Sequence, residues 1–138
     1  MASKFLMVIA TILAVFGLLY LFSPQTLAET AGLTANASGL TDIRATYGGF
    51  QIGLALFLFW SCRSADNVGN ALVATGVIFA CVGLGRLFGV IVDDEFSGFN
   101  MIGLIFEVFL TAACAYFYQS HKRLNSATTA IKMPGYQQ

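Results

Sequence analysis

The chain alternates between long apolar runs and short polar segments. Four runs approach or exceed the ~20 predominantly apolar residues that a helix needs to cross a bilayer, and they lie at about residues 5–22, 45–62, 71–92 and 100–118. Each run is too long for a typical strand, and none alternates apolar with polar residues as membrane-barrel strands do. The pattern predicts an all-α membrane protein, a bundle of four transmembrane helices with short loops.

The first polar segment, residues 23–43, is the longest predicted loop. Its opening dipeptide, Ser23-Pro24, is a typical helix start, because proline suits the first helical position and serine suits the N-cap. We therefore expect a short interfacial helix that ends at about Thr30. Near the end of the loop, Thr41 is a candidate N-cap for a second-span helix that begins outside the membrane.

The remaining polar segments predict the domain organisation. Short turns are expected at residues 63–67 and 93–98, so residues 1–120 form one transmembrane domain. Residues 121–138 are polar and end in a segment that contains proline and glycine, which predicts a disordered tail. The first run could also be read as a cleaved signal peptide, but it is longer than the roughly 7–15 apolar residues of such signals. We therefore expect it to be a span.

The basic residues predict the orientation of the spans, because short cytoplasmic loops carry an excess of lysine and arginine. One side of the predicted bundle carries five of them, and the other side carries only Arg44 among several acids. The five are Lys4, Arg63, Lys122, Arg123 and Lys132. Both termini of the multi-pass protein are therefore predicted to be cytoplasmic. If the source is bacterial, the membrane is the inner membrane and the first and third loops face the periplasm.

Composition supports a lipid environment and excludes one class of partner. Of the 138 residues, 57% are hydrophobic and only 10% are charged, whereas a soluble domain has about 25% charged residues. The formal net charge is zero, so the chain lacks the basic footprint of a nucleic-acid-binding protein. The bilayer is the expected partner.

Two charged residues lie inside predicted spans. Arg86 precedes Asp93 by seven positions, and Glu107 follows Asn100 by seven, so each lies about 10 Å below the outer end of its helix. An isolated charge at the centre of a span costs at least ~2.5 kcal/mol. We therefore expect Arg86 and Glu107 to pair.

The second predicted span adds polar residues at the same depth. Arg44, Tyr47 and Gln51 have the i, i+3, i+7 spacing of one helix face. With Arg86 and Glu107 they form a predicted polar cluster in the periplasmic half of the bundle. Two interpretations stay open: the cluster binds a ligand, or the charged pair only holds two helices together.

Glycines accompany the polar residues at a spacing typical of close helix packing. Gly49 and Gly53 flank Gln51, and Gly85 and Gly89 bracket Arg86, each pair four residues apart. We expect these glycines to pack against neighbouring helices. The alternative is that they leave room for a ligand beside the polar groups.

The sequence predicts no catalytic residue, metal site or cofactor. Cys62, Cys81 and Cys114 are in no CxxC pair and fall within or at the cytoplasmic end of the spans, where a disulfide is not expected. His121 is the only histidine and lies beside Lys122, so we expect a surface role. No nucleotide-binding loop or nucleophile triad is present.

Several of these residues occur in a pattern that resembles the domain of unknown function 4345 family, small bacterial inner-membrane proteins loosely similar to DoxX-like four-helix proteins. The likeness runs from about residue 5 to 120, and R-x-x-Y-G-G at residues 44–49 is its most specific part. It also includes Gln51, Gly53-Leu54, the segment Gly83-Leu84-Gly85-Arg86-Leu87-Phe88-Gly89, and Glu107. The resemblance implies four helices, adds Gly48 to the residues of interest and supplies no substrate.

Three functions agree with these observations. The first is a non-enzymatic protein that binds a lipid, a quinone, another small ligand or a protein partner through the polar cluster. The second is an accessory or assembly subunit of a larger membrane complex. The third is a small transporter, which would need to form a homo-oligomer because four spans are few. An enzyme is the least favoured, because no second catalytic group joins Glu107.

Overall fold

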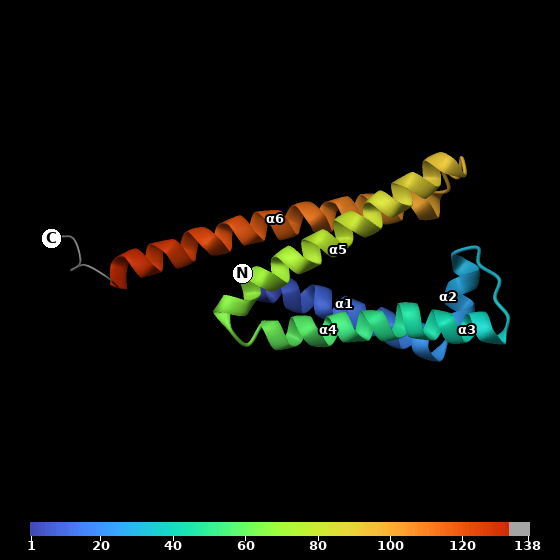
Figure 1. The fold of residues 1–138 in the computed structure, drawn as a ribbon, viewed down its shortest axis with the longest axis horizontal. Helices are drawn as coiled ribbons and strands as arrows, with labels where there is room; N and C mark the ends of the chain where they lie inside the picture. Colours follow the sequence, from blue (N-terminus) through green and yellow to red (C-terminus); the bar gives the residue numbers. More distant parts are fainter. Residues whose placement is uncertain (133–138) are drawn as a thin grey trace. The chain divides into compact units, whose positions relative to one another are not determined.

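The structure, a computed structural model, describes residues 1–132, and all the regular elements there are helical. In chain order they are α1 (Ala2–Phe22), α2 (Pro24–Thr30), α3 (Ala37–Ile43), the π-helical η1 (Arg44–Gly49), α4 (Phe50–Ser61), α5 (Ala65–Val92) and α6 (Gly98–Lys132) (Figure 1). The chain forms two compact units. The N-terminal unit is Ser3–Ser64, and the C-terminal unit is Ala65 onward with Met1 and Ala2.

Three helices are long and apolar enough to cross a membrane: α1, α5 and the Gly98–Leu124 part of α6. They contain three of the four predicted spans and confirm the all-helical, membrane-type fold among the described residues. The predicted second span differs, because the π-helical segment divides it. Alone, the 12 residues of α4 fall short of the ~20 that a crossing needs.

Helix α1 packs closely against η1 and α4 within the N-terminal unit. A Cβ added at Gly17 would lie 2.8 Å from Cγ1 of Ile52, and one at Gly48 would lie 3.2 Å from the Gly17 carbonyl oxygen. The Nε of Arg44 donates a hydrogen bond of 3.2 Å to the Leu21 carbonyl, which lies in the last turn of α1 and has no partner further along that helix. Two glycines and one arginine thus hold the two segments together.

The caps of the short helices agree only in part with the sequence. Helix α2 has the predicted bounds and has Pro24 at its start, although the side chain of Ser23 makes no capping bond. Thr41 is not a cap. Its hydroxyl donates to the Ala37 carbonyl inside α3, and Asn36 caps that helix by accepting a 2.9 Å hydrogen bond from Gly39 N. Asn is an equally good N-cap residue, and here it starts the helix five residues earlier.

Helices α5 and α6 form an antiparallel hairpin in the C-terminal unit (Figure 1). Three glycines of α5, spaced seven residues apart, face three residues of α6 that have the same spacing: Gly69 with His121, Gly76 with Cys114, and Gly83 with Glu107. A seven-residue repeat keeps one seam of each helix in contact, and small residues on that seam let the backbones approach closely.

Both helices of this hairpin are longer than the predicted spans. Helix α5 begins at Ala65 and has Asp66 in its first turn, where a carboxylate stabilises a helix N-terminus. Helix α6 continues to Lys132, whereas the sequence predicted a disordered tail from residue 121. Residues 121–132 contain no glycine or proline that would interrupt the helix. Residues 133–138 of the predicted tail lie outside the described part.

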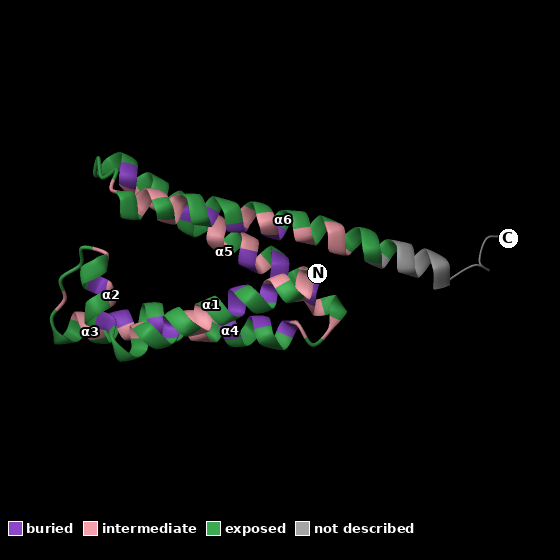
Figure 2. Cartoon of the chain, turned by 180° about the vertical axis from the view of Figure 1, so that it is seen from behind, coloured by how far each residue is buried: buried purple, intermediate pink, exposed green. Residues whose placement is uncertain are grey.

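Buried residues are confined to narrow strips along the helices (Figure 2). In the N-terminal unit they include Leu6, Ala10 and Leu58, and in the C-terminal unit Val68, Leu72 and Cys114. Most other large apolar side chains are exposed, among them Phe22, Leu84, Phe88, Ile102, Ile105 and Phe109. Water disfavours so much exposed apolar surface, and a bilayer accommodates it.

Candidate functional site

Arg86 and Glu107 form an ion pair between α5 and α6. The Nη2 of Arg86 lies 2.7 Å from Oε1 of Glu107, and the Nε lies 2.9 and 3.1 Å from the two carboxylate oxygens. This two-nitrogen arrangement is the strong, planar form of an arginine–carboxylate contact. Glu107 is only 5% exposed, so its charge is balanced inside the protein and not by solvent.

Each charged side chain lies over a glycine of the opposite helix. A Cβ at Gly103 would lie 2.8 Å from Cζ and 2.9 Å from Nε of Arg86, and a Cβ at Gly83 would lie 3.4 Å from Cβ of Glu107. Gly83 is one turn before Arg86 on α5, and Gly103 is one turn before Glu107 on α6. Each helix therefore has a glycine where the charged side chain of the other helix packs. The guanidinium occupies the space that a side chain at residue 103 would fill.

Asn100 is a third member of the cluster, and the sequence prediction missed it. The Nη1 of Arg86 donates a 3.3 Å hydrogen bond to Oδ1 of Asn100, whose Nδ2 lies 3.5 Å from the Glu95 carbonyl. Asn100 therefore connects the charged pair to the turn between the two helices. A signal was present, because Asn100, Gly103 and Glu107 have the i, i+3, i+7 spacing of one helix face.

The cluster is open on one side. The side chain of Arg86 is 26% exposed, whereas that of Glu107 is 6% exposed. Since the carboxylate neutralises the guanidinium, the exposed edge carries no net charge. Such an edge suits a carbonyl or another oxygen acceptor better than it suits a free anion.

The other predicted cluster residues lie in the N-terminal unit. Arg44 is half-buried and bonds to Leu21, and Tyr47 stacks on Tyr20 with ring centroids 5.3 Å apart. Gln51 lies in the first turn of α4, and its Oε1 is buried and accepts no hydrogen bond from the described residues. That these residues join Arg86 and Glu107 in one cluster stays a prediction.

The predicted packing glycines differ in what surrounds them. Gly48 touches α1, as described above, whereas added Cβ atoms at Gly53 and Gly85 would meet nothing within 4 Å. The nearest atoms to such a Cβ at Gly49 and Gly89, both at 3.9 Å, belong to nearby residues of the chain, Arg44 and Asp93. The close contacts of α5 fall on the seven-residue glycine seam, which lies on another face of the helix from Gly85 and Gly89.

The remaining reactive groups stand apart from the cluster. All three cysteines are free thiols, and Nε2 of His121 lies 3.0 Å from the Ala65 carbonyl, where the two helices of the hairpin meet. Within residues 1–132, no three His, Cys, Asp or Glu side chains are grouped to hold a metal ion.

Comparison with known proteins gives a family and no activity. No curated protein and no solved structure matches the chain. The model of one family, described as Domain of unknown function (DUF4345), matches residues 1–118, which include the whole charged cluster. The chain belongs to this family of unknown function, and the resemblance found in its sequence is confirmed.

Proposed function

We propose that the protein is a non-enzymatic, four-span protein of the bacterial inner membrane that binds a small amphiphilic ligand at Arg86, Glu107 and Asn100. The ligand presents an oxygen acceptor, such as a quinone carbonyl or a lipid ester, to the exposed edge of the guanidinium. Both termini are cytoplasmic in this proposal, so the cluster lies in the periplasmic half of the membrane.

Continuous helical backbone supports a fourth crossing. The residues at the junctions of α3, η1 and α4 all have helical dihedral angles, with φ of −59° and ψ of −43° at Arg44, and −61° and −46° at Phe50. Residues 37–61 therefore form one helical rod with a π-helical turn inside it. At about 1.5 Å per residue such a rod exceeds the ~30 Å thickness of the hydrocarbon core.

The single observation that carries the proposal is a buried, neutralised and partly open ion pair within helices that are apolar enough to cross a membrane. A buried pair is weak evidence of stabilisation, because well-packed apolar residues often serve the fold as well or better. Ionisable residues inside membrane spans are typically found where a ligand, an ion or a proton is handled. Ligand contact therefore explains the pair better than helix packing does.

A paired apolar replacement separates ligand binding from helix packing. In the double variant Arg86→Met with Glu107→Met no charge is left behind, so we expect the protein to insert and stay monodisperse in detergent. We expect it to lose binding of a short-chain ubiquinone analogue, measured by native mass spectrometry. The single variant Arg86→Met is the comparison, because it leaves the Glu107 carboxylate unpaired and should unfold more easily by ~3–5 kcal/mol.

The control replaces an exposed residue of α6 that lies outside the cluster, Phe109→Met. The wild type, the control and the double variant could all retain the quinone analogue, and any lipid carried through purification, equally well. That result would mean that the ion pair serves only helix packing. A well-folded double variant that has lost the bound species supports the proposal.

A further inference from the structure

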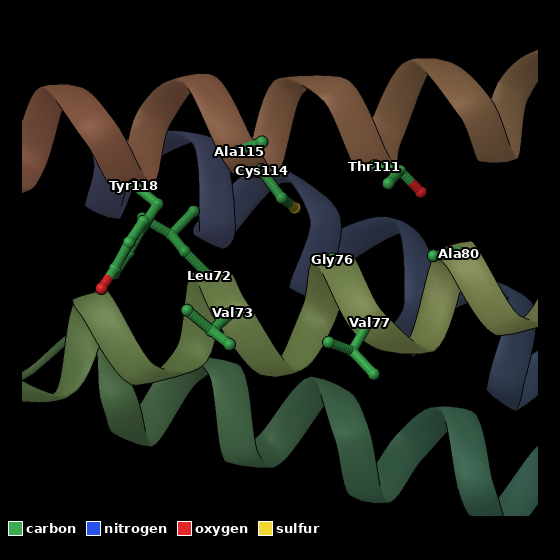
Figure 3. A pocket seen from close by; sticks show the side chains of 9 residues that line it. All are labelled: Leu72, Val73, Gly76, Val77, Ala80, Thr111, Cys114, Ala115 and Tyr118. Carbon is green, nitrogen blue, oxygen red and sulfur yellow. The ribbon is translucent and has the colours of Figure 1, made fainter.

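A second site lies in the same hairpin, nearer the end that carries His121. The structure has an apolar groove of about 300 Å³ between α5 and α6 (Figure 3). We call it the hairpin groove, and the side chains that define it include Leu72, Val73, Gly76, Val77, Cys114 and Tyr118. Gly76 and Cys114 lie at its centre, where the thiol points from α6 towards α5 (Figure 3).

The groove has the chemistry of a site for hydrocarbon. The hydroxyl of Thr111 already donates a 2.8 Å hydrogen bond to the Glu107 carbonyl, so it needs no polar ligand as an acceptor. The volume is at the lower end of the ~300–1,000 Å³ of ligand pockets. Along α5 the groove extends from Leu72 to Ala80, about 12 Å, which is close to the ~15 Å depth of one leaflet of hydrocarbon. These dimensions suit a single extended chain.

Within the hairpin itself, the groove is open along one edge. Val73 and Val77 are 46% and 56% exposed, and Tyr118 at its end is 37% exposed. A whole helix is about 10–12 Å in diameter and is too thick to enter a space of this volume. A flexible chain enters from the side, as lipid does in a bilayer.

Positive charge lies beyond the end of the groove. His121 and Lys122 follow Tyr118 by three and four residues, which places them on the same face of α6 one turn further. Lys122 and Arg123 are exposed, and the sequence has no acidic residue after Glu107. The acidic residue at this end of α5 is Asp66, in its first turn. Basic side chains that directly follow a membrane span attract anionic lipid head groups.

We propose that the hairpin groove holds one acyl chain of an anionic phospholipid, whose phosphate lies against Lys122, and the neighbouring Arg123 adds positive charge at the same end of α6. This site shares no side chain with the cluster of Arg86, Glu107 and Asn100, and it stands whether or not that cluster binds a ligand. The groove selects a lipid by its chain, and the basic turn beyond it selects by charge.

Photo-crosslinking tests the position of the chain. The full-length protein is placed in nanodiscs with phosphatidylglycerol that carries a diazirine on one acyl chain, and the adducts are mapped by peptide mass spectrometry. We expect adducts on the segments around residues 72–80 and 111–118. Ala115→Phe fills the groove from an exposed lining position and should remove these adducts, whereas Ala112→Phe places the same ring on an exposed part of α6 outside the groove and should preserve them.

Competition tests the head group. Native mass spectrometry should show phosphatidylglycerol retained in preference to phosphatidylcholine by the wild type. Neutralising both basic residues, Lys122→Gln with Arg123→Gln, should lower this preference by about tenfold or more, since each basic group near a membrane surface contributes ~1 kcal/mol. Lys4→Gln, an exposed lysine on α1, is the matched control and should have no effect.

Three outcomes would overturn the proposal. The first is adducts spread evenly over all lipid-facing residues, and the second is equal adduct yields from Ala115→Phe and Ala112→Phe. The third is a dimer that protects the groove from the probe and dissociates with Ala115→Phe, which would make the groove an interface between two copies. A folded Ala115→Phe protein that has lost only the groove adducts supports the lipid site.

Discussion

At the scale of single residues, two glycines determine where the charged side chains lie. Gly103 makes room for the guanidinium of Arg86, and Gly83 makes room for Glu107. A larger residue at either place would push a charge away from its partner and towards the hydrocarbon. The ion pair therefore depends on the absence of side chains at Gly83 and Gly103 as well as on the charged groups themselves.

We expect Gly103→Ala to destabilise the C-terminal unit by about 1–3 kcal/mol, the usual cost of overpacking. The new Cβ would lie 2.8 Å from Cζ of Arg86, so the guanidinium, which bonds to Glu107 and Asn100, would have to shift. Thermal unfolding in detergent, followed by circular dichroism, measures the change.

The matched control for that variant is Gly85→Ala, because a Cβ there meets nothing within 4 Å and alanine favours a helix over glycine by about 1 kcal/mol. It should leave stability equal or slightly higher. A second check repeats Gly103→Ala in the Arg86→Met and Glu107→Met background, where its cost should shrink. An unchanged cost in that background would contradict the proposed role of Gly103.

The sequence predicted the charged pair from two general quantities. The rise per residue of a helix places both charges at one depth, and a lone charge in lipid is unfavourable. The sequence analysis missed Asn100, which looked like an ordinary residue at the beginning of a span. It expected packing at Gly85 and Gly89, whose four-residue spacing is familiar from membrane helices, and it did not single out the glycines of α5 that contact α6. The seam of Gly69, Gly76 and Gly83 is spaced by seven and becomes visible only once its partner helix is known.

At the scale of elements, the π-helical η1 is the least expected feature. π-helical turns are rare and are frequent at functional sites, and this one coincides with the R-x-x-Y-G-G motif at residues 44–49. Its arginine bonds to the end of α1, its tyrosine stacks on Tyr20 and its first glycine touches Gly17. Every one of these contacts joins η1 to α1.

Gly48→Ala should therefore weaken the N-terminal unit, by about 1–3 kcal/mol. Its Cβ would lie 3.2 Å from the Gly17 carbonyl oxygen and from Leu21 N, and backbone atoms cannot rotate out of the way as a side chain does. Differential scanning calorimetry of the detergent-solubilised protein would show a lower Tm. Gly53→Ala, for which no neighbour lies within 4 Å, should keep the Tm of the wild type, and equal losses from both variants would count against this contact.

Periodicity could not reveal this element. A stripe of Arg44, Tyr47 and Gln51 follows from 3.6 residues per turn, and that number does not hold inside η1. The sequence analysis placed these three residues on one face of an α-helix, whereas Arg44 and Tyr47 lie in the π-helical η1 and Gln51 lies in α4. The N-cap of α3 could not be predicted either. Both Asn36 and Thr41 are residue types that cap helices well, and only the structure shows that Asn36 is the cap.

At the scale of the whole molecule, the proposed four crossings make a prediction about sidedness. Single cysteines are introduced after Cys62, Cys81 and Cys114 are replaced by alanine, and intact cells are treated with a membrane-impermeant maleimide. We expect Thr34→Cys and Glu95→Cys to react from outside, and Ser64→Cys and Ser126→Cys to react only after the membrane is permeabilised.

The opposite pattern is equally specific. If residues 37–61 did not cross, Ser64→Cys and Ser126→Cys would react in intact cells, and Glu95→Cys would be protected. That result would leave the three crossings of α1, α5 and α6 and would place the charged cluster nearer the cytoplasm.

Composition alone predicted the class of the molecule, since a chain with 10% charged residues has too few polar groups to cover a surface in water. The helical class and three of the predicted spans follow from run length in the same way. The paired faces of the helices do not, because apolar residues surround each helix and every face looks equally suitable for packing. Only the rare polar and small residues carried information about the interfaces.

The π-helical turn has one more consequence. A turn closed by i→i+5 bonds contains one residue more than an α-helical turn, so residues before and after it are rotated by about 100° relative to an uninterrupted α-helix. Removing one amino acid at Ala45 or Thr46 would relax the turn into ordinary α-helix and swing the segment before it around the helix axis. The length of this short stretch, as well as its composition, decides which way the loop before it faces.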